Sequence, residues 1–268
     1  MRSIFYFKGV DKFGIGYAVG CLFSILFWKV DRHKLLKYMD LKIRKIFKYP
    51  LLVQAFYILS IILVCLLLKK AAPKELYNAI TAFLVIDISN TERYNLSIKE
   101  KVDFYNTITT ITRAIVCGFI APLLYILILG NYFAITYTII HNLSYEKEYK
   151  LFLFIWRIFT IVPSLILQMF LYVIFVIRTK EISIDYKNEY ISGIFINPLL
   201  NANILAAYVE SINFYYYFNI KGTDYIKSYG KYNNSIEYGH IKDYLAIAYI
   251  VCTIFFIIFL GCNIAKIY

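Results

Sequence analysis

The chain has 268 residues, 60% of them hydrophobic, and a mean hydropathy of +0.61. A soluble domain of this length would be nearer half apolar, so the composition excludes an ordinary soluble protein and predicts a membrane protein. The net charge of +12 lies mostly beside apolar runs, so we attribute it to membrane orientation and anionic lipid headgroups, and we predict no nucleic-acid partner.

The first apolar run, Phe13 to Trp28, is short but can form a span. It is followed by "KVDRHKLLKYMDLKIRKIFKYP", in which apolar residues recur at helical spacing with Lys and Arg on the other face. This pattern predicts an amphipathic helix on a membrane surface. Residues 29–49 carry eight Lys or Arg against two Asp. The positive-inside rule therefore places them on the cytoplasmic side of the inner membrane, where they would meet anionic headgroups.

A second span is predicted from Leu51 to Leu68. Residues 75–113 begin with a shorter apolar part that Asp87 interrupts, which indicates an interfacial or bundle-packed helix and then a polar helix. The next apolar run, roughly Ala114 to Leu143, is either one strongly tilted helix or two helices broken near Gly130-Asn131. Pro122 lacks the amide hydrogen of a helix residue and predicts a kink.

Further spans are predicted at Leu151–Ile177 and Leu245–Ile264. Between them, residues 178–243 contain an apolar stretch typical of a helix lying against the bundle, and a loop from Asn219 to His240. The predicted fold class is all-α: a polytopic integral membrane helical bundle of about five spans (four to six), with interfacial amphipathic helices. We expect one membrane domain over 1–268, with regions at 1–50, 51–177, 178–243 and 244–268.

No nucleotide-binding glycine motif or metalloprotease motif occurs, and no histidine has a second histidine at helical spacing. The sequence therefore gives no self-evident catalytic constellation; acids that could bind magnesium are present, but their spacing selects none of them as ligands. The five cysteines lie in apolar runs without paired spacing, which is typical of buried thiols.

The segment "GFIAPLLYILILGNYFAITY" carries one further pattern. Without a gap, nine of its positions fit a membrane-enzyme signature: Gly118, Ile120, Ala121, Pro122, Leu123, Tyr125, Gly130, Ala134 and Tyr137. This segment resembles the CbiB/CobD family of cobalamin biosynthesis. "HNL" at His141 to Leu143, the Val162-Pro163 pair and "NPLLNANILAAYVESINFYYYF" extend the resemblance over roughly residues 111–264.

The resemblance implies a polytopic inner-membrane enzyme that amidates a corrinoid carboxylate with aminopropanol or its phosphate, using ATP and Mg²⁺. It also implies a set of substrate-binding residues: Gly118, Pro122, Tyr125, Tyr137, His141, Asn201 and Asn203. Positions where the family has acidic or amide side chains hold Cys117, Thr112 and Arg113, and another acidic position falls near Arg157. If the reaction is retained, other acids must serve, and the candidates are Glu210, Asp185 and Asp224.

Three interpretations follow. The chain is a divergent amide synthase of this family that binds a corrinoid, or a non-catalytic sensor or scaffold similar to AmpE, a membrane relative with the same kind of helix but without the acid set. The third is a transporter permease subunit, since bundles with Gly and Pro breaks also fit. The second and third interpretations imply a membrane or soluble protein partner.

Overall fold

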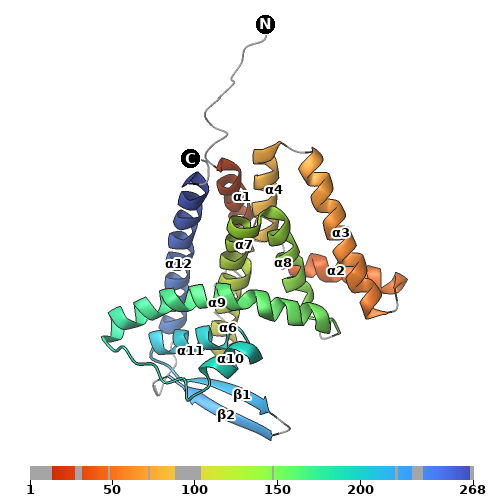
Figure 1. The fold of residues 1–268 in the computed structure, drawn as a ribbon. Coiled ribbons are helices and arrows are strands. Elements are labelled where there is room, and N and C mark those ends of the chain that lie inside the picture. Colours follow the sequence, from red (N-terminus) through yellow and green to blue (C-terminus); the bar gives the residue numbers. More distant parts are fainter. Residues whose placement is uncertain are drawn as a thin grey trace. The chain divides into compact units, whose positions relative to one another are not determined.

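A computed structural model describes residues 14–27, 32–47, 49–71, 73–87, 104–146, 148–220, 223–230 and 238–265 (Figure 1). The chain forms two compact units. The first unit comprises Met1–Ser89, Ala121–Trp156 and Thr253–Tyr268, and the second comprises Asn90–Ile120 and Arg157–Cys252.

Three helical stretches among the described residues are long and apolar enough to cross a membrane: Ile108–Leu129, Lys150–Thr179 and Gly239–Ala265. They overlap three of the predicted runs, so the expectation of a membrane-embedded helical protein is confirmed by helix length and composition. Three shorter apolar helical stretches also occur, Ile15–Leu26, Pro50–Leu63 and Leu200–Val209. The predicted number of about five spans is not established by the long helices.

In the first unit, helix α1 (Ile15–Leu26) packs along helix α4 (Lys74–Val85). Gly16, Gly20 and Ser24 form the contact, and a Cβ atom added at Gly20 would lie 2.2 Å from the carbonyl oxygen of Ala79. The Ser24 hydroxyl donates a hydrogen bond to the carbonyl oxygen of Ile86. This small-residue spacing lets two helix backbones approach closely, as membrane helices do.

Helices α7 (Ala121–Leu129) and α8 (Asn131–Leu143) lie side by side as a helical hairpin (Figure 1). Gly130 connects them with φ 86° and ψ 177°, a backbone conformation open mainly to glycine. Of the two alternatives for this apolar run, the pair of helices broken at Gly130 is therefore correct. Helices α2 (Arg32–Ile46) and α3 (Pro50–Ala71) both contact α8.

The predicted kink at Pro122 takes the form of a π-helical turn. Helix α6 (Phe104–Ile115) continues into a π turn over Val116–Ile120, and α7 follows directly. Proline has no amide hydrogen to offer the carbonyl of Gly118, so the ordinary helical ladder cannot continue through this position. A widened turn is one of the ways in which a helix absorbs such a break.

In the second unit, α11 (Leu200–Val209) contacts α6, α10 (Tyr190–Ile196) and a two-stranded antiparallel sheet. The helices α9 (Lys150–Thr179) and α12 (Tyr238–Ala265) contribute residues to both units.

Strands β1 (Phe214–Ile220) and β2 (Thr223–Tyr229) form a hairpin with Phe214 paired to Tyr229. Residues 214–218, at the end of the apolar stretch for which a helix was expected, are therefore strand, and the first part of the loop expected from Asn219 to His240 is strand as well. The aromatic residues of β1 have a higher preference for strands than for helices.

Candidate functional site: a buried ion network beside helix α2

Helix α2 is the amphipathic helix that the sequence predicts, but its most buried described side chain is acidic. Asp40 is 2% exposed, whereas Met39 is 45% and Ile46 is 74% exposed. The helix therefore turns a carboxylate toward the protein and leaves part of its apolar face open. A buried carboxylate requires hydrogen-bond partners or an opposite charge.

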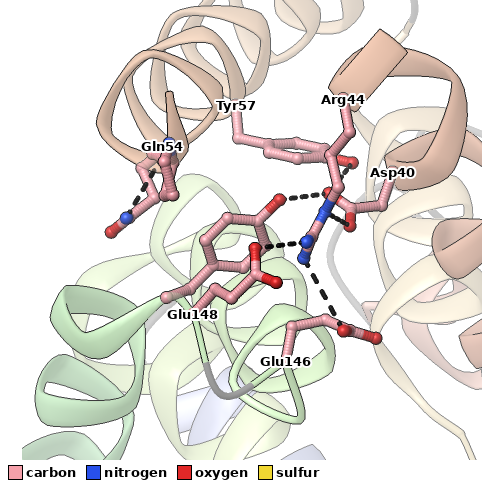
Figure 2. A network of polar contacts seen from close by, with 8 residues as sticks. Asp40, Arg44, Gln54, Tyr57, Glu146 and Glu148 are labelled. Carbon is pink, nitrogen blue, oxygen red and sulfur yellow. Dashed lines mark hydrogen bonds and ion pairs between the residues drawn. The ribbon is translucent and has the colours of Figure 1, made fainter. Parts of the chain in front are cut away.

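Three side chains supply those partners (Figure 2). The hydroxyl groups of Tyr57, on α3, and Tyr149, directly before α9, donate to Asp40 Oδ1 at 3.2 and 2.7 Å. Arg44 Nε, one helical turn along α2, donates to Asp40 Oδ2 at 2.7 Å. Burial and the charge of Asp40 raise the pKa of the Tyr149 hydroxyl, so Tyr149 remains a proton donor. Both carboxylate oxygens of Asp40 are thus engaged.

Arg44 connects this buried carboxylate to the loop after α8. Its Nη1 donates to Glu148, its Nη2 lies 3.6 Å from Glu146, and its guanidinium group stacks 4.7 Å from the ring centre of Tyr149. Burial acts to lower the pKa of Arg44, but the hydrogen bond and charge of Asp40 outweigh it and raise that pKa above its ordinary value. Arg44 therefore carries its charge at all physiological pH values and ties α2 to the α8–α9 loop.

A groove of about 440 Å³ lies next to the network, between α2, α3 and α8. Tyr57 belongs to both features, since its ring lines the groove while its hydroxyl reaches Asp40. Lys42 is the charged side chain among the lining residues, which are Leu36, Met39, Lys42, Ile43, Phe56, Tyr57, Ser60, Ile61, Ile135 and Ile139. Such a lining accommodates an apolar chain with an anionic end.

The network is suited to holding elements together and poorly suited to catalysis. Asp40 has both oxygens engaged in hydrogen bonds and faces a permanent positive charge, which stabilises its ionised form and makes it a weak base. Within the described part of the chain, no group of three or more His, Cys, Asp or Glu side chains could hold a metal ion.

The structure brings together three of the predicted substrate-binding residues in the first unit. The ring centres of Tyr125 and Tyr137 are 5.1 Å apart, and those of Tyr137 and His141 are 6.3 Å apart and stacked. These rings pack within the α7–α8 hairpin. Gly118, in the π turn, and Pro122, in α7, are buried.

Asn201 and Asn203 are both 1% exposed on α11, in the second unit. Asn201 Nδ2 donates to the carbonyl oxygen of Tyr190 at 2.8 Å. Among the described residues, neither Asn201 Oδ1 nor Asn203 Oδ1 has a hydrogen-bond partner. Both are thus buried acceptors on one short helix, a costly arrangement if nothing else contacts them.

The three candidate acids have different surroundings. Glu210, which ends α11, is 4% exposed and forms an ion pair of 3.1 Å with Arg178. Burial raises its pKa to about 7, although Arg178 opposes the shift. Asp185 is exposed and accepts a hydrogen bond from the backbone amide of Lys187, while the side chain of Asp224 lies outside the described residues.

The central residues of the network were missed by the sequence analysis. Asp40 and Arg44 stand one helical turn apart, a spacing that favours an ion pair and could have been noticed. Tyr57 and Tyr149 gave no signal, because they come from distant positions in a chain with many tyrosines.

The fold and the long apolar helices define the chain as a helical membrane protein. Comparisons with protein-family models, with curated protein sequences and with solved structures found no match.

Proposed function

We propose that this chain is a non-catalytic membrane protein, a sensor or scaffold of the AmpE-like kind. The observation that carries this proposal is the contrast within the family-like segment. Helix packing buries Gly118, Pro122, Tyr125 and Tyr137. By contrast, Cys117, Thr112 and Arg113 occupy positions where the enzyme family has acidic or amide groups. The parts needed for folding are retained and the parts needed for phosphoryl chemistry are replaced.

The proposal also includes an arrangement in the membrane. Helices α1 and α3 are taken as additional spans beside the three long helices, which gives about five; α3 has 22 residues, enough to cross. Residues 29–49 then lie on the cytoplasmic surface of the inner membrane, where their basic side chains meet anionic headgroups. The Asp40–Arg44 network supports this position of α2, because it joins α2 to α3 and to the loop between α8 and α9.

The absence of catalysis can be tested directly. The purified full chain would be incubated with adenosylcobyric acid, aminopropanol phosphate, ATP and Mg²⁺ beside an authentic synthase, and the amide would be sought by mass spectrometry. We expect product from the synthase alone. Amide formation by this chain would overturn the proposal.

The sidedness has its own test. Lys45, exposed on α2, would be replaced by Cys and labelled with a membrane-impermeant thiol reagent in vesicles of known orientation. We expect the Cys variant to be labelled more strongly than the unsubstituted chain only in inside-out vesicles. Labelling confined to right-side-out vesicles would place α2 on the opposite face.

A divergent amide synthase is the second candidate, and one observation favours it. Glu210 is buried with a pKa raised to about 7, which is the range of an effective general base. The same helix carries the side-chain oxygens of Asn201 and Asn203, which have no hydrogen-bond partner within the part of the chain that the structure describes. If amide forms, Glu210→Gln should abolish it while Asp185→Asn, on the surface, should leave it unchanged.

A further inference from the structure

We propose that the groove between α2, α3 and α8 is a binding site for an anionic phospholipid. One acyl chain fills the groove, and the phosphate is held by Lys42. This inference rests on the proposed position of α2 at the membrane surface, and it does not depend on whether the chain is an enzyme.

The size and lining of the groove fit an acyl chain. Its volume of about 440 Å³ lies in the range of roughly 300–1,000 Å³ that small-molecule sites occupy. Aliphatic side chains come from all three helices, among them Ile43, Ile61 and Ile139, and the aromatic rings of Phe56 and Tyr57 join them. A chain without hydrogen-bonding groups leaves nothing unsatisfied in such a lining.

The charge at the groove selects the headgroup. Lys42 lines the groove from α2 and is exposed, with its Nζ 4.6 Å from the ring centre of Tyr38. Lys37 and Lys45 are exposed on the same helix. Asp40 does not neutralise them, because it is buried and bonded to Arg44. A phosphate with net negative charge therefore complements this surface better than a zwitterionic headgroup does.

The rigidity of the groove wall follows from the ion network. Tyr57 contributes its ring to the groove and its hydroxyl to Asp40 at 3.2 Å. The position of α2 relative to α3 is thereby fixed by polar contacts that lie outside the groove. A wall held in this way is formed before the lipid arrives, which lowers the entropic cost of binding.

Native mass spectrometry of the full chain in detergent tests the proposal. Dioleoyl phosphatidylglycerol and dioleoyl phosphatidylcholine have identical acyl chains and differ in net charge. We expect preferential retention of phosphatidylglycerol. Lys42→Gln should weaken this retention by up to roughly fivefold, the effect of losing one exposed ion pair with the phosphate. Lys45→Gln removes the same charge from the same helix but outside the groove lining, where it forms no such pair, and should change retention less than about twofold.

A second pair of variants tests the groove itself. Ile139→Trp places a larger ring in the groove and should reduce retention of both lipids. Leu59→Trp adds the same ring on an exposed face of α3, away from the groove lining, and should have no effect. Circular dichroism of each variant shows whether it remains folded, and Lys42→Gln, at an exposed position, keeps the test valid if Ile139→Trp does not fold.

The outcomes separate this inference from the proposal on which it rests. If the unsubstituted chain shows no preference for phosphatidylglycerol, both the contact of α2 with anionic headgroups and the groove site are wrong. If the preference exists but neither Lys42→Gln nor Ile139→Trp changes retention, only the groove site is wrong. A dimer of the chain that Ile139→Trp abolishes would mean that a second copy occupies the groove, and would also overturn the lipid site.

Discussion

Replacing Asp40 with Asn should lower the free energy of unfolding by about 2–3 kcal/mol. The Asn carbonyl can still accept from Tyr57 and Tyr149, but its amide nitrogen then faces Arg44 Nε, now 2.7 Å from Asp40 Oδ2, and both groups are donors. Removing one partner of a fully buried ion pair costs roughly 3–5 kcal/mol. Arg44 is partly exposed and keeps its ion pair with Glu148. The expected loss for Asp40→Asn is therefore the smaller value of about 2–3 kcal/mol.

The matched control is Glu148→Gln, which removes a negative charge from the other side of the same guanidinium group. Because the Glu148 side chain is 61% exposed, this change should cost less than about 0.5 kcal/mol. Both variants would be unfolded with increasing sodium dodecyl sulfate in mixed micelles and followed by circular dichroism. The double variant Asp40→Asn with Arg44→Met should lose less than the sum of the single variants, because it leaves no unpaired charge at the buried position, and Glu148 is solvated. Equal losses for Asp40→Asn and Glu148→Gln would refute the description of Asp40 as a buried centre.

Three further predictions concern other parts of the chain. Gly20→Ala should destabilise the protein by roughly 1–3 kcal/mol in the same titration, because the added Cβ meets the backbone of α4; Gly261→Ala, with no atom within 4 Å, should be neutral or slightly stabilising. Gly130→Ala should lower the free energy of unfolding by about 1–3 kcal/mol through backbone strain alone, since φ is 86° and no neighbour lies within 4 Å. Gly239→Ala, also in open space, is the control, and an equal loss for that variant would disprove the strain explanation. The pKa of Glu210 is raised from 4.5 to about 7, so the folded state binds its proton more tightly and stability should fall as pH rises from about 4.5 through 7. Glu210→Gln should flatten that part of a melting-temperature profile against pH, and an unchanged slope would contradict the assignment.

The helices were predictable where one physical signal dominated. Long apolar runs predicted α9 and α12, and the 3.6-residue period predicted α2. Gly130 marked a break correctly because few other residues tolerate its backbone angles. The hairpin at 214–229 was missed because its aromatic residues were counted as apolar, although the same residues prefer strands.

The candidate site was less predictable because its parts meet only in three dimensions. Tyr149 lies 109 residues from Asp40, and no periodic pattern links them. The structure brings together only some of the residues that the family resemblance suggested: Tyr125, Tyr137 and His141 form one aromatic cluster. Asn201 and Asn203 belong to the other compact unit, and their role stays a prediction.

The buried charge explains why an amphipathic helix leaves apolar residues open. The rotation of a helix about its axis is usually set by burial of its apolar stripe. In α2, the hydrogen bonds of Asp40 to other elements fix the rotation instead, because turning this carboxylate away would leave the hydroxyl groups of Tyr57 and Tyr149 without their acceptor. Met39 and Ile46 consequently lie exposed. In the proposed position of α2 at the membrane surface, lipid would cover these side chains and so offset the cost of exposing them.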